Sequence, residues 1–206
     1  PCLLGEGDFF FAGQAALIRF LQVGFGQLFF YVPAVTMGMI AEERRSGTLE
    51  LLAAKPLDDM EIVMGKWLAA WLLVAVALLF SLPYYITVAP LGPIYHGASL
   101  SGYLGLLFVS AAYVSIGLFA SSLAHNQIVA FLLSLFLAVF LHLLFGQMAM
   151  ILPGALADVA SFLDLQGHFQ TMARGVMDAA SVLYVFSLTL IGLLAATVSL
   201  KSRSWS

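Results

Sequence analysis

The sequence predicts an all-α, polytopic membrane protein, and three observations carry this prediction. Of 206 residues, 62% are hydrophobic and 9% are charged, whereas ordinary soluble domains have about 45–50% and about 25%. The mean hydropathy is +1.02. Residues 67–157 contain no Lys, Arg, Asp or Glu. A stretch of that length must comprise several membrane spans, because one span takes about 20 apolar residues.

The same composition excludes several functional classes. It rules out a soluble globular enzyme and a disordered chain, because neither combines such high apolar content with so few charges. The net charge of −3 leaves no basic face to meet nucleic-acid phosphates. Cys2 is the single cysteine, which excludes a disulfide framework and a Cys-based metal site. We therefore predict no catalytic residue, bound cofactor or metal site in this chain.

We expect five spans, all helical, because a backbone in lipid must satisfy its hydrogen bonds within its own segment. A closed barrel would need strands of alternating polarity, but these runs are continuously apolar. The first span is the weakest, since it contains Gln22, Gln27 and Pro33. The expected spans lie at about residues 20–40, 67–88, 103–123, 128–152 and 182–200.

The Lys and Arg residues indicate the orientation of these spans. In a five-span arrangement, Arg19 and Arg174 fall on one side and the other six of the eight cationic residues fall on the opposite side. Residues 41–66 and the C-terminus are therefore expected in the cytoplasm, and residues 153–181 outside. The chain starts with Pro1 rather than Met, so we expect a fragment that lacks the first of six spans; a cleaved signal peptide is the less favoured alternative.

The charged segment 41–66 is the most informative connection. Residues 48–54 are mostly good helix formers with Leu on one face, which is consistent with a short surface helix. Pro56 would end that helix. Asp58 would then cap the next helix, with Glu61 three residues later in a capping-box spacing. The segment suits a docking surface for another protein, although its charges are also compatible with an ordinary solvated helix end.

Four stretches resemble the permeases of type-2 ABC transporters, and in particular the gliding-motility and copper-enzyme-maturation subgroup. The most specific is TMGMIAEERRSGTLELLAAKPLDDMEIVMGKW at 36–67; the others are FFFAGQAAL at 9–17, residues 102–131 and residues 168–189. Many such permeases have a basic residue where this chain has Gly38.

This resemblance implies a fold and partners. Segment 41–66 would contain a cytoplasmic coupling helix that docks on a separate ABC ATPase subunit, and residues 153–181 would form partly re-entrant extracellular helices. ATP and magnesium would bind only to the partner. A second permease copy, or a related permease, would complete the complex in a prokaryotic inner membrane. By residue match, the contact residues would be Glu42, Glu43, Arg44, Arg45, Gly47, Thr48, Glu50, Leu51 and Leu52.

The residues themselves also favour an external energy source. The chain has no phosphate-binding loop of the G-x-x-x-x-G-K-[ST] type. Ion-driven transporters usually carry acidic or histidine relays at membrane depth, and here His142 alone lies well inside a span. We interpret it as a packing residue that hydrogen-bonds a neighbour. His168 and Asp164 are four residues apart and could meet on a helix, but two ligands do not make a metal site.

The predicted function is therefore a non-catalytic permease subunit of an ATP-driven transporter, with export favoured by the resemblance. A membrane scaffold that anchors an ATPase complex without moving a substrate is the alternative, since it would use the same docking segment. An intramembrane enzyme is poorly supported because no catalytic set lies within the spans. The sequence does not identify the substrate.

Overall fold

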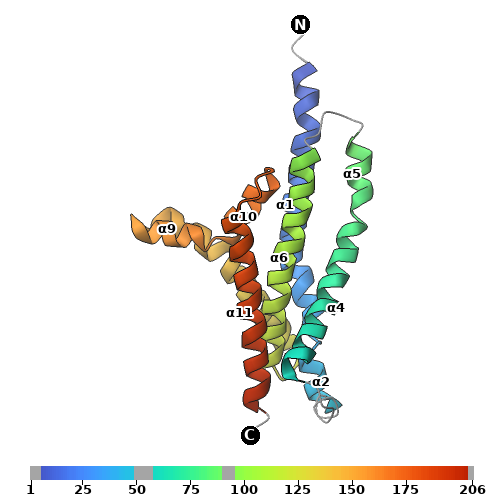
Figure 1. Cartoon of the computed structure of the whole chain (residues 1–206), viewed down its shortest axis with the longest axis vertical. Coiled ribbons are helices and arrows are strands. Elements are labelled where there is room, and N and C mark those ends of the chain that lie inside the picture. The colour runs from blue at the N-terminus through green and yellow to red at the C-terminus, as the bar shows by residue number, and fades with distance from the viewer. Residues whose placement is uncertain (1–5, 49–57, 90–95, 204–206) are drawn as a thin grey trace.

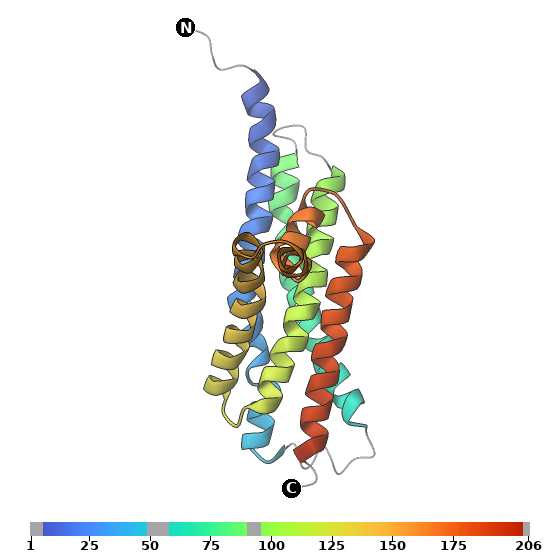
Figure 2. The ribbon, with the colours of Figure 1, turned by 90° about the vertical axis from the view of Figure 1, so that its left-hand side faces the viewer.

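The computed structural model describes residues 6–48, 58–89 and 96–203, with side chains from residue 18 to residue 202. All regular elements in these ranges are helical. Figures 1 and 2 show a bundle of long helices, with α2 and the end of α11 at one end and the start of α1 at the other. The helices are α1 (Glu6–Thr36), α2 (Ala41–Arg45), α4 (Asp59–Leu79), α5 (Leu82–Val88), α6 (His96–Leu123), α7 (Gln127–Val139), η2 (Phe140–Leu144), α8 (Phe145–Ile151), α9 (Ala155–Phe162), α10 (Leu165–Ala173) and α11 (Ala179–Arg203).

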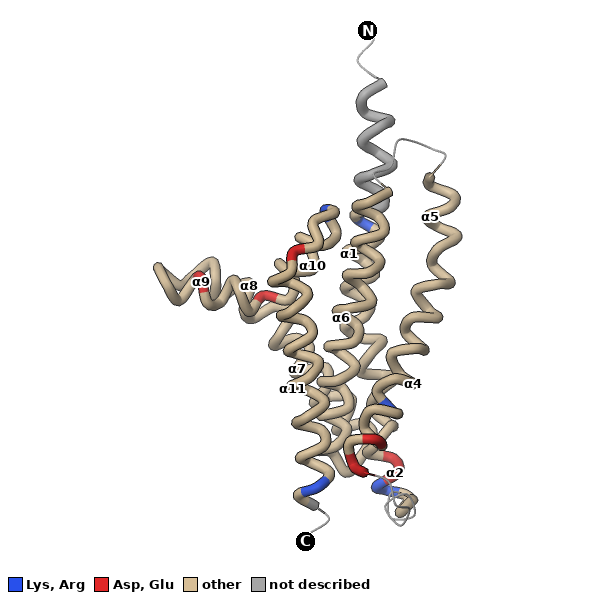
Figure 3. Tube along the Cα trace, viewed as in Figure 1, with Lys and Arg blue, Asp and Glu red and all other residues tan. Residues whose placement is uncertain are grey.

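The all-α membrane fold is confirmed. Five helical segments in the described ranges are long and apolar enough to cross a bilayer. In Figure 3 the charged residues gather towards the ends of these segments, whereas the long middle parts of α4, α6, α7 and α11 carry none. The segments are Ile18–Arg45, Asp59–Val88, His96–Leu123, Gln127–Ile151 and Ala179–Ser202.

Several helix ends differ from the sequence prediction. Helix α1 begins at Glu6 rather than near Phe20, and α6 begins at His96 rather than at Tyr103. Hydropathy marks only the membrane-embedded part of a helix, and both helices continue beyond it. Helix α1 ends at Thr36, before the expected Ile40. Pro33 has no N–H to donate to the Phe29 carbonyl, so the turn that precedes this end lacks one helix hydrogen bond.

The second span is interrupted, which the sequence analysis did not predict. Helix α4 ends at Leu79, and α5 starts afresh at Leu82 after a turn at Phe80 and Ser81. Pro83 explains the break, because it has no N–H to donate and its ring clashes with the carbonyl of Leu79 four residues earlier. Ser81 Oγ donates instead to the Leu78 carbonyl at 2.6 Å.

The fourth span also deviates from a regular α-helix. Residues 140–144 form one π-helical turn, η2, between α7 and α8. Such turns are rare and occur frequently at functional sites. Asn126 caps the start of the span by accepting a hydrogen bond from the Ile128 N–H at 3.1 Å, and the turn residues 124–127 match the short connection expected there.

Helix α6 is the centre of the bundle and packs against α1, α4, α7, α10 and α11. Small residues permit these close approaches, as expected for membrane helices. Gly117 faces Thr36 of α1, and Gly192 of α11 faces Ser115 of α6 so closely that a Cβ on either glycine would overlap its neighbour. Trp67 and Trp71 of α4 each donate an indole hydrogen bond at 3.0 Å to a carbonyl of α6.

Residues 153–181 contain the helix pair α9 and α10. Figures 1 and 2 show α9 projecting sideways from the bundle, while α10 lies against it. Helix α10 buries Leu165, Phe169 and Met172, and Asp164 caps it by accepting from the Gln166 N–H at 3.1 Å.

Candidate functional site: the corner between α1 and α2

Residues 37–48, which we call the corner, turn the chain from α1 into α2 at the charged end of the bundle. The α1 backbone finishes in a tight turn in which the Met39 N–H donates to the Thr36 carbonyl at 3.2 Å. Thr36 is fully buried and its hydroxyl donates to the Val32 carbonyl at 2.9 Å. The corner therefore starts from a fixed helix end that rests on Gly117 of α6.

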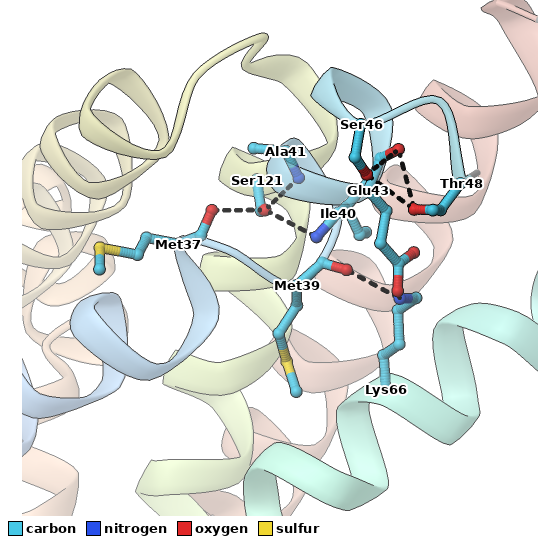
Figure 4. A network of polar contacts seen from close by, with 9 residues as sticks. All are labelled: Met37, Met39, Ile40, Ala41, Glu43, Ser46, Thr48, Lys66 and Ser121. Carbon is cyan, nitrogen blue, oxygen red and sulfur yellow. Dashed lines mark hydrogen bonds and ion pairs between the residues drawn. The ribbon is translucent and has the colours of Figure 1, made fainter.

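Ser121 of α6 fastens this turn (Figure 4). Its hydroxyl accepts from the N–H groups of Ile40 and Ala41 at 3.2 and 3.1 Å and donates to the Met37 carbonyl at 3.1 Å. A hydroxyl has one donor and two acceptor sites, so all are used. The first N–H groups of a helix have no partner within it, and here a serine from another helix supplies the cap that Ile40 cannot.

Lys66 joins α4 to the same corner. Its ammonium donates to the Met39 carbonyl at 2.7 Å and forms an ion pair with Glu43. The Lys66 side chain is 15% exposed and that of Glu43 is 35% exposed, so this pair is screened less than one on an open surface. The second carboxylate oxygen of Glu43 is buried and has no hydrogen-bond partner among the described residues.

Arg44 joins α2 to the hairpin between α6 and α7. Its Nη1 donates to the carbonyls of Ser122 and Ala124 at 2.7 and 3.2 Å. The last carbonyls of a helix lack partners within it, and a cation beside them also interacts favourably with the helix dipole. Arg44 therefore holds α2 against the hairpin between α6 and α7.

The remaining part of the corner faces outward. Arg45, Ser46, Gly47 and Thr48 are exposed. Gly47 has φ +73°, a backbone conformation that favours glycine. The hydroxyls of Ser46 and Thr48 lie 2.8 Å apart, and each donates to the Glu43 carbonyl. This arrangement gives the outward-facing segment a defined shape.

The helix cap after the charged segment has the form that the sequence predicts. Asp58 is the N-cap of α4, and its backbone N–H donates to the Glu61 carboxylate at 3.3 Å. The predicted contact residues Glu50, Leu51 and Leu52, the helix expected over 48–54 and Pro56 fall wholly or partly in residues 49–57, which lie outside the described residues.

The structure thus divides the predicted contact residues by position. Glu43 and Arg44 are tied to other helices, Glu42 is half-buried, and Arg45, Gly47 and Thr48 are exposed. Ser121 and the carbonyl of Met39 complete the corner, and sequence reasoning did not assign them to it. The sequence offers one signal for Ser121, its spacing of four residues from Gly117 on α6, and such a pair of small residues indicates helix packing.

Two histidines serve the packing of the opposite half. His142, in η2, pairs its Nδ1 with the Tyr113 hydroxyl at 3.0 Å, and its ring stacks on Phe25 at 4.6 Å. His168 uses both ring nitrogens, towards Ser181 at 2.9 Å and the Phe162 carbonyl at 2.8 Å. It therefore does not join Asp164 in a ligand pair. No cluster of three potential metal ligands occurs among the described residues.

Comparison with known families decides the identity. The family model described as ABC-2 family transporter protein matches residues 25–203. The chain belongs to the ABC-2 transporter family. This ABC-2 protein is accordingly a multi-pass membrane protein of a transporter system. No curated protein matches its sequence significantly.

Proposed function

We propose that this ABC-2 family chain is the permease subunit of an ATP-driven exporter and that the exposed part of the corner docks on a separate ABC ATPase subunit. The ATPase would supply ATP and magnesium. One observation carries the proposal: the exposed segment 45–48 directly follows corner residues that continue α1 and are bonded to α4 through Lys66 and to α6 through Ser121 and Arg44.

The bonding pattern suits the transmission of force. A push on α2 acts on α1 through the covalent turn, on α4 through Lys66 and on α6 through Ser121 and Arg44. Protein interiors are close-packed and deform little. We therefore expect a push on α2 to move these helices together rather than to deform the corner. Two such subunits would open a path between them, with the corner and the C-terminus in the cytoplasm of a prokaryotic cell.

Several finer features belong to the same proposal. The subunit pairs with a second copy or a related permease in the plasma membrane. The resemblance of residues 36–67 to the gliding-motility and copper-enzyme-maturation permeases supports that subgroup and the outward direction of transport. A scaffold without transport of its own would retain the docking and lack substrate-stimulated ATP turnover.

The decisive experiment is a detergent pull-down of the tagged protein from its native host with variant Arg45→Glu. Arg45 is exposed, so charge reversal leaves the internal bonds of the corner intact. We expect recovery of the ATPase subunit to fall about tenfold, equivalent to about 1.4 kcal/mol. Arg44 is unsuitable, because reversing it would also break the bonds to Ser122 and Ala124.

Arg174→Glu is the matched control, since it reverses an exposed arginine that directly follows α10, which lies towards the opposite end of the bundle. Recovery of the ATPase should be unchanged in this variant. Equal recovery with Arg45→Glu and wild type would remove the docking role of segment 45–48. Recovery of the wild-type chain without any ATPase would overturn the permease assignment.

A further inference from the structure

A cavity of about 560 Å³ lies between α1, α4 and α6, away from the corner. We call it the α1–α4 groove. It extends along α1 from Phe20 to Tyr31. On the other side it extends along α4 from Val74 and continues past the end of that helix to Ser81. Its volume lies within the roughly 300–1,000 Å³ of small-molecule sites.

The groove exists because small side chains form its floor. Gly24 of α1 and Ala77 of α4 line it together with Leu106 of α6. A Cβ added at Gly24 would meet Leu106 at 3.6 Å, an ordinary contact distance, so Leu106 packs directly opposite Gly24 at the floor of the groove. Beyond the groove, the rings of Phe20 and Tyr84 stack at 4.3 Å and connect α1 to α5.

The lining is suited to a hydrocarbon chain. Among the described lining residues, only Gln27, Tyr31 and Ser81 are polar, and the Ser81 hydroxyl already donates to the Leu78 carbonyl of α4. Phe30 is 60% exposed at the open side. A polar ligand would leave hydrogen-bonding groups unsatisfied here, which disfavours its binding.

The length of the groove matches one leaflet of a bilayer. Residues 20–31 of α1 span about 16 Å at a rise of about 1.5 Å per residue. The hydrocarbon core of a bilayer is about 30 Å thick, so this is about half its depth. The groove is therefore as long as an acyl chain that extends from the α9–α10 side of the membrane to the bilayer centre.

A cation, Arg19, precedes the groove-lining stretch of α1 in the sequence. Arg19 directly precedes the lining residue Phe20, is exposed, and makes no ion pair with a described residue. A guanidinium binds phosphate oxygens through paired hydrogen bonds. The apolar groove and this arginine together fit an amphiphile with one acyl chain inside and an anionic head group outside.

We infer that the α1–α4 groove is a binding site for an anionic phospholipid, with an acyl chain between Gly24 and Ala77 and the head group at Arg19. The inference goes beyond the proposed function, because it concerns the chain alone and requires no ATPase. The bound lipid comes from the leaflet on the side of Arg19, which is the side opposite the corner.

The test uses the full chain in phosphatidylcholine nanodiscs that contain a minor fraction of phosphatidylglycerol with a diazirine in its acyl chain. After illumination, mass spectrometry maps the labelled peptides. We expect labelling to concentrate on residues 20–31 and 74–81. Uniform labelling of all lipid-facing helices, including exposed Phe186 and Leu190 of α11, or no labelling of the groove, would overturn the site.

Variants that fill the groove sharpen the test. Ala77→Trp from α4 and Gly24→Leu from α1 each occupy the space independently, and we expect about tenfold less groove labelling, or about 1.4 kcal/mol of binding. Ala69→Trp is the matched control, because Ala69 is exposed on the same helix outside the groove. Unchanged labelling in both filling variants would contradict the inference.

The head-group assignment has its own test. Arg19→Gln should reduce labelling by the phosphatidylglycerol probe several-fold and leave labelling by a phosphatidylcholine probe unchanged, whereas Arg19→Lys should retain most of the difference. Equal labelling by both probes in the wild type would remove the role of Arg19. The Ala77→Trp variant should recover the ATPase in the pull-down as the wild type does. The lipid-binding inference and the docking proposal tested by Arg45→Glu can therefore be contradicted independently.

Discussion

Ser121 concentrates three directional bonds at one buried hydroxyl. It receives two N–H groups from the start of α2 and donates to the end of α1, and its side chain is fully buried. Lys66 and Arg44 act in the same region, so α1, α2, α4 and α6 meet through polar atoms at the end of an otherwise apolar bundle. At this scale, single side chains determine the geometry of the candidate docking site.

Replacing Ser121 with Ala should therefore lower the free energy of unfolding by about 1–3 kcal/mol, because two N–H groups and one carbonyl lose a partner in a buried site. Thermal unfolding in detergent measures this change. Ser110→Ala is the control: Ser110 is equally buried on α6 but bonds only within its own helix, to the Leu107 carbonyl at 2.8 Å. Equal losses in the two variants would show that Ser121 does not fasten the corner.

Helix α6 organises the bundle at the level of secondary structure. It faces α1 and α11 through small residues at which neither helix has room for a larger side chain. The contact between Gly117 and Thr36 lies one turn before Ser121 and sets the height at which α1 ends. The close packing along α6 and the polar bonds at the end of α6 thus hold the corner in one position.

Gly117→Ala should destabilise the protein by about 1–3 kcal/mol, because the added methyl group overlaps Thr36 and forces the two helices apart. The melting temperature in detergent should fall accordingly. Gly65→Ala on α4 is a matched control, since nothing lies within 4 Å of its added Cβ. There the better helix propensity of Ala should leave stability unchanged or raise it by up to about 1 kcal/mol. A stable Gly117→Ala variant would contradict the tight crossing.

The whole molecule presents two differently charged ends separated by apolar helices. The corner and the end of α11 lie at one end, and α10 together with the start of α11 lies towards the other (Figure 3). The chain crosses the bundle an odd number of times between the corner and α10, so the corner and α10 lie on opposite sides of the bilayer. The excess of Lys and Arg at the corner end favours the cytoplasm for that side.

Single-cysteine variants in a Cys2→Ser background test this orientation. A membrane-impermeant thiol reagent should label Asp178→Cys on intact cells and label Thr48→Cys only after the membrane is permeabilised. Both positions are exposed, so access depends on the side of the membrane rather than on burial. Lys201→Cys, at the end of α11, should behave like Thr48→Cys. Labelling of Thr48→Cys on intact cells would reverse the assigned orientation.

The sequence by itself determined the all-helical class, the five spans, the position of the charged segment and the capping of α4 by Asp58 and Glu61. These features depend on local hydropathy or on groups three residues apart, which a linear chain displays directly. The helix ends at Glu6 and His96, the break at Ser81 and the π-helical turn were missed, because helices continue beyond the membrane and adjust to their neighbours.

Only the tertiary structure decided which charged residues face inward and which face a partner. Arg44 and Arg45 are adjacent and chemically alike, yet one bonds to the α6–α7 hairpin and the other is exposed. Ser121 reaches the corner from 80 residues away, and the groove forms where Gly24, Ala77 and Leu106 converge. Such assignments depend on how separate helices pack, and a local pattern contains no information about a contact made across the bundle.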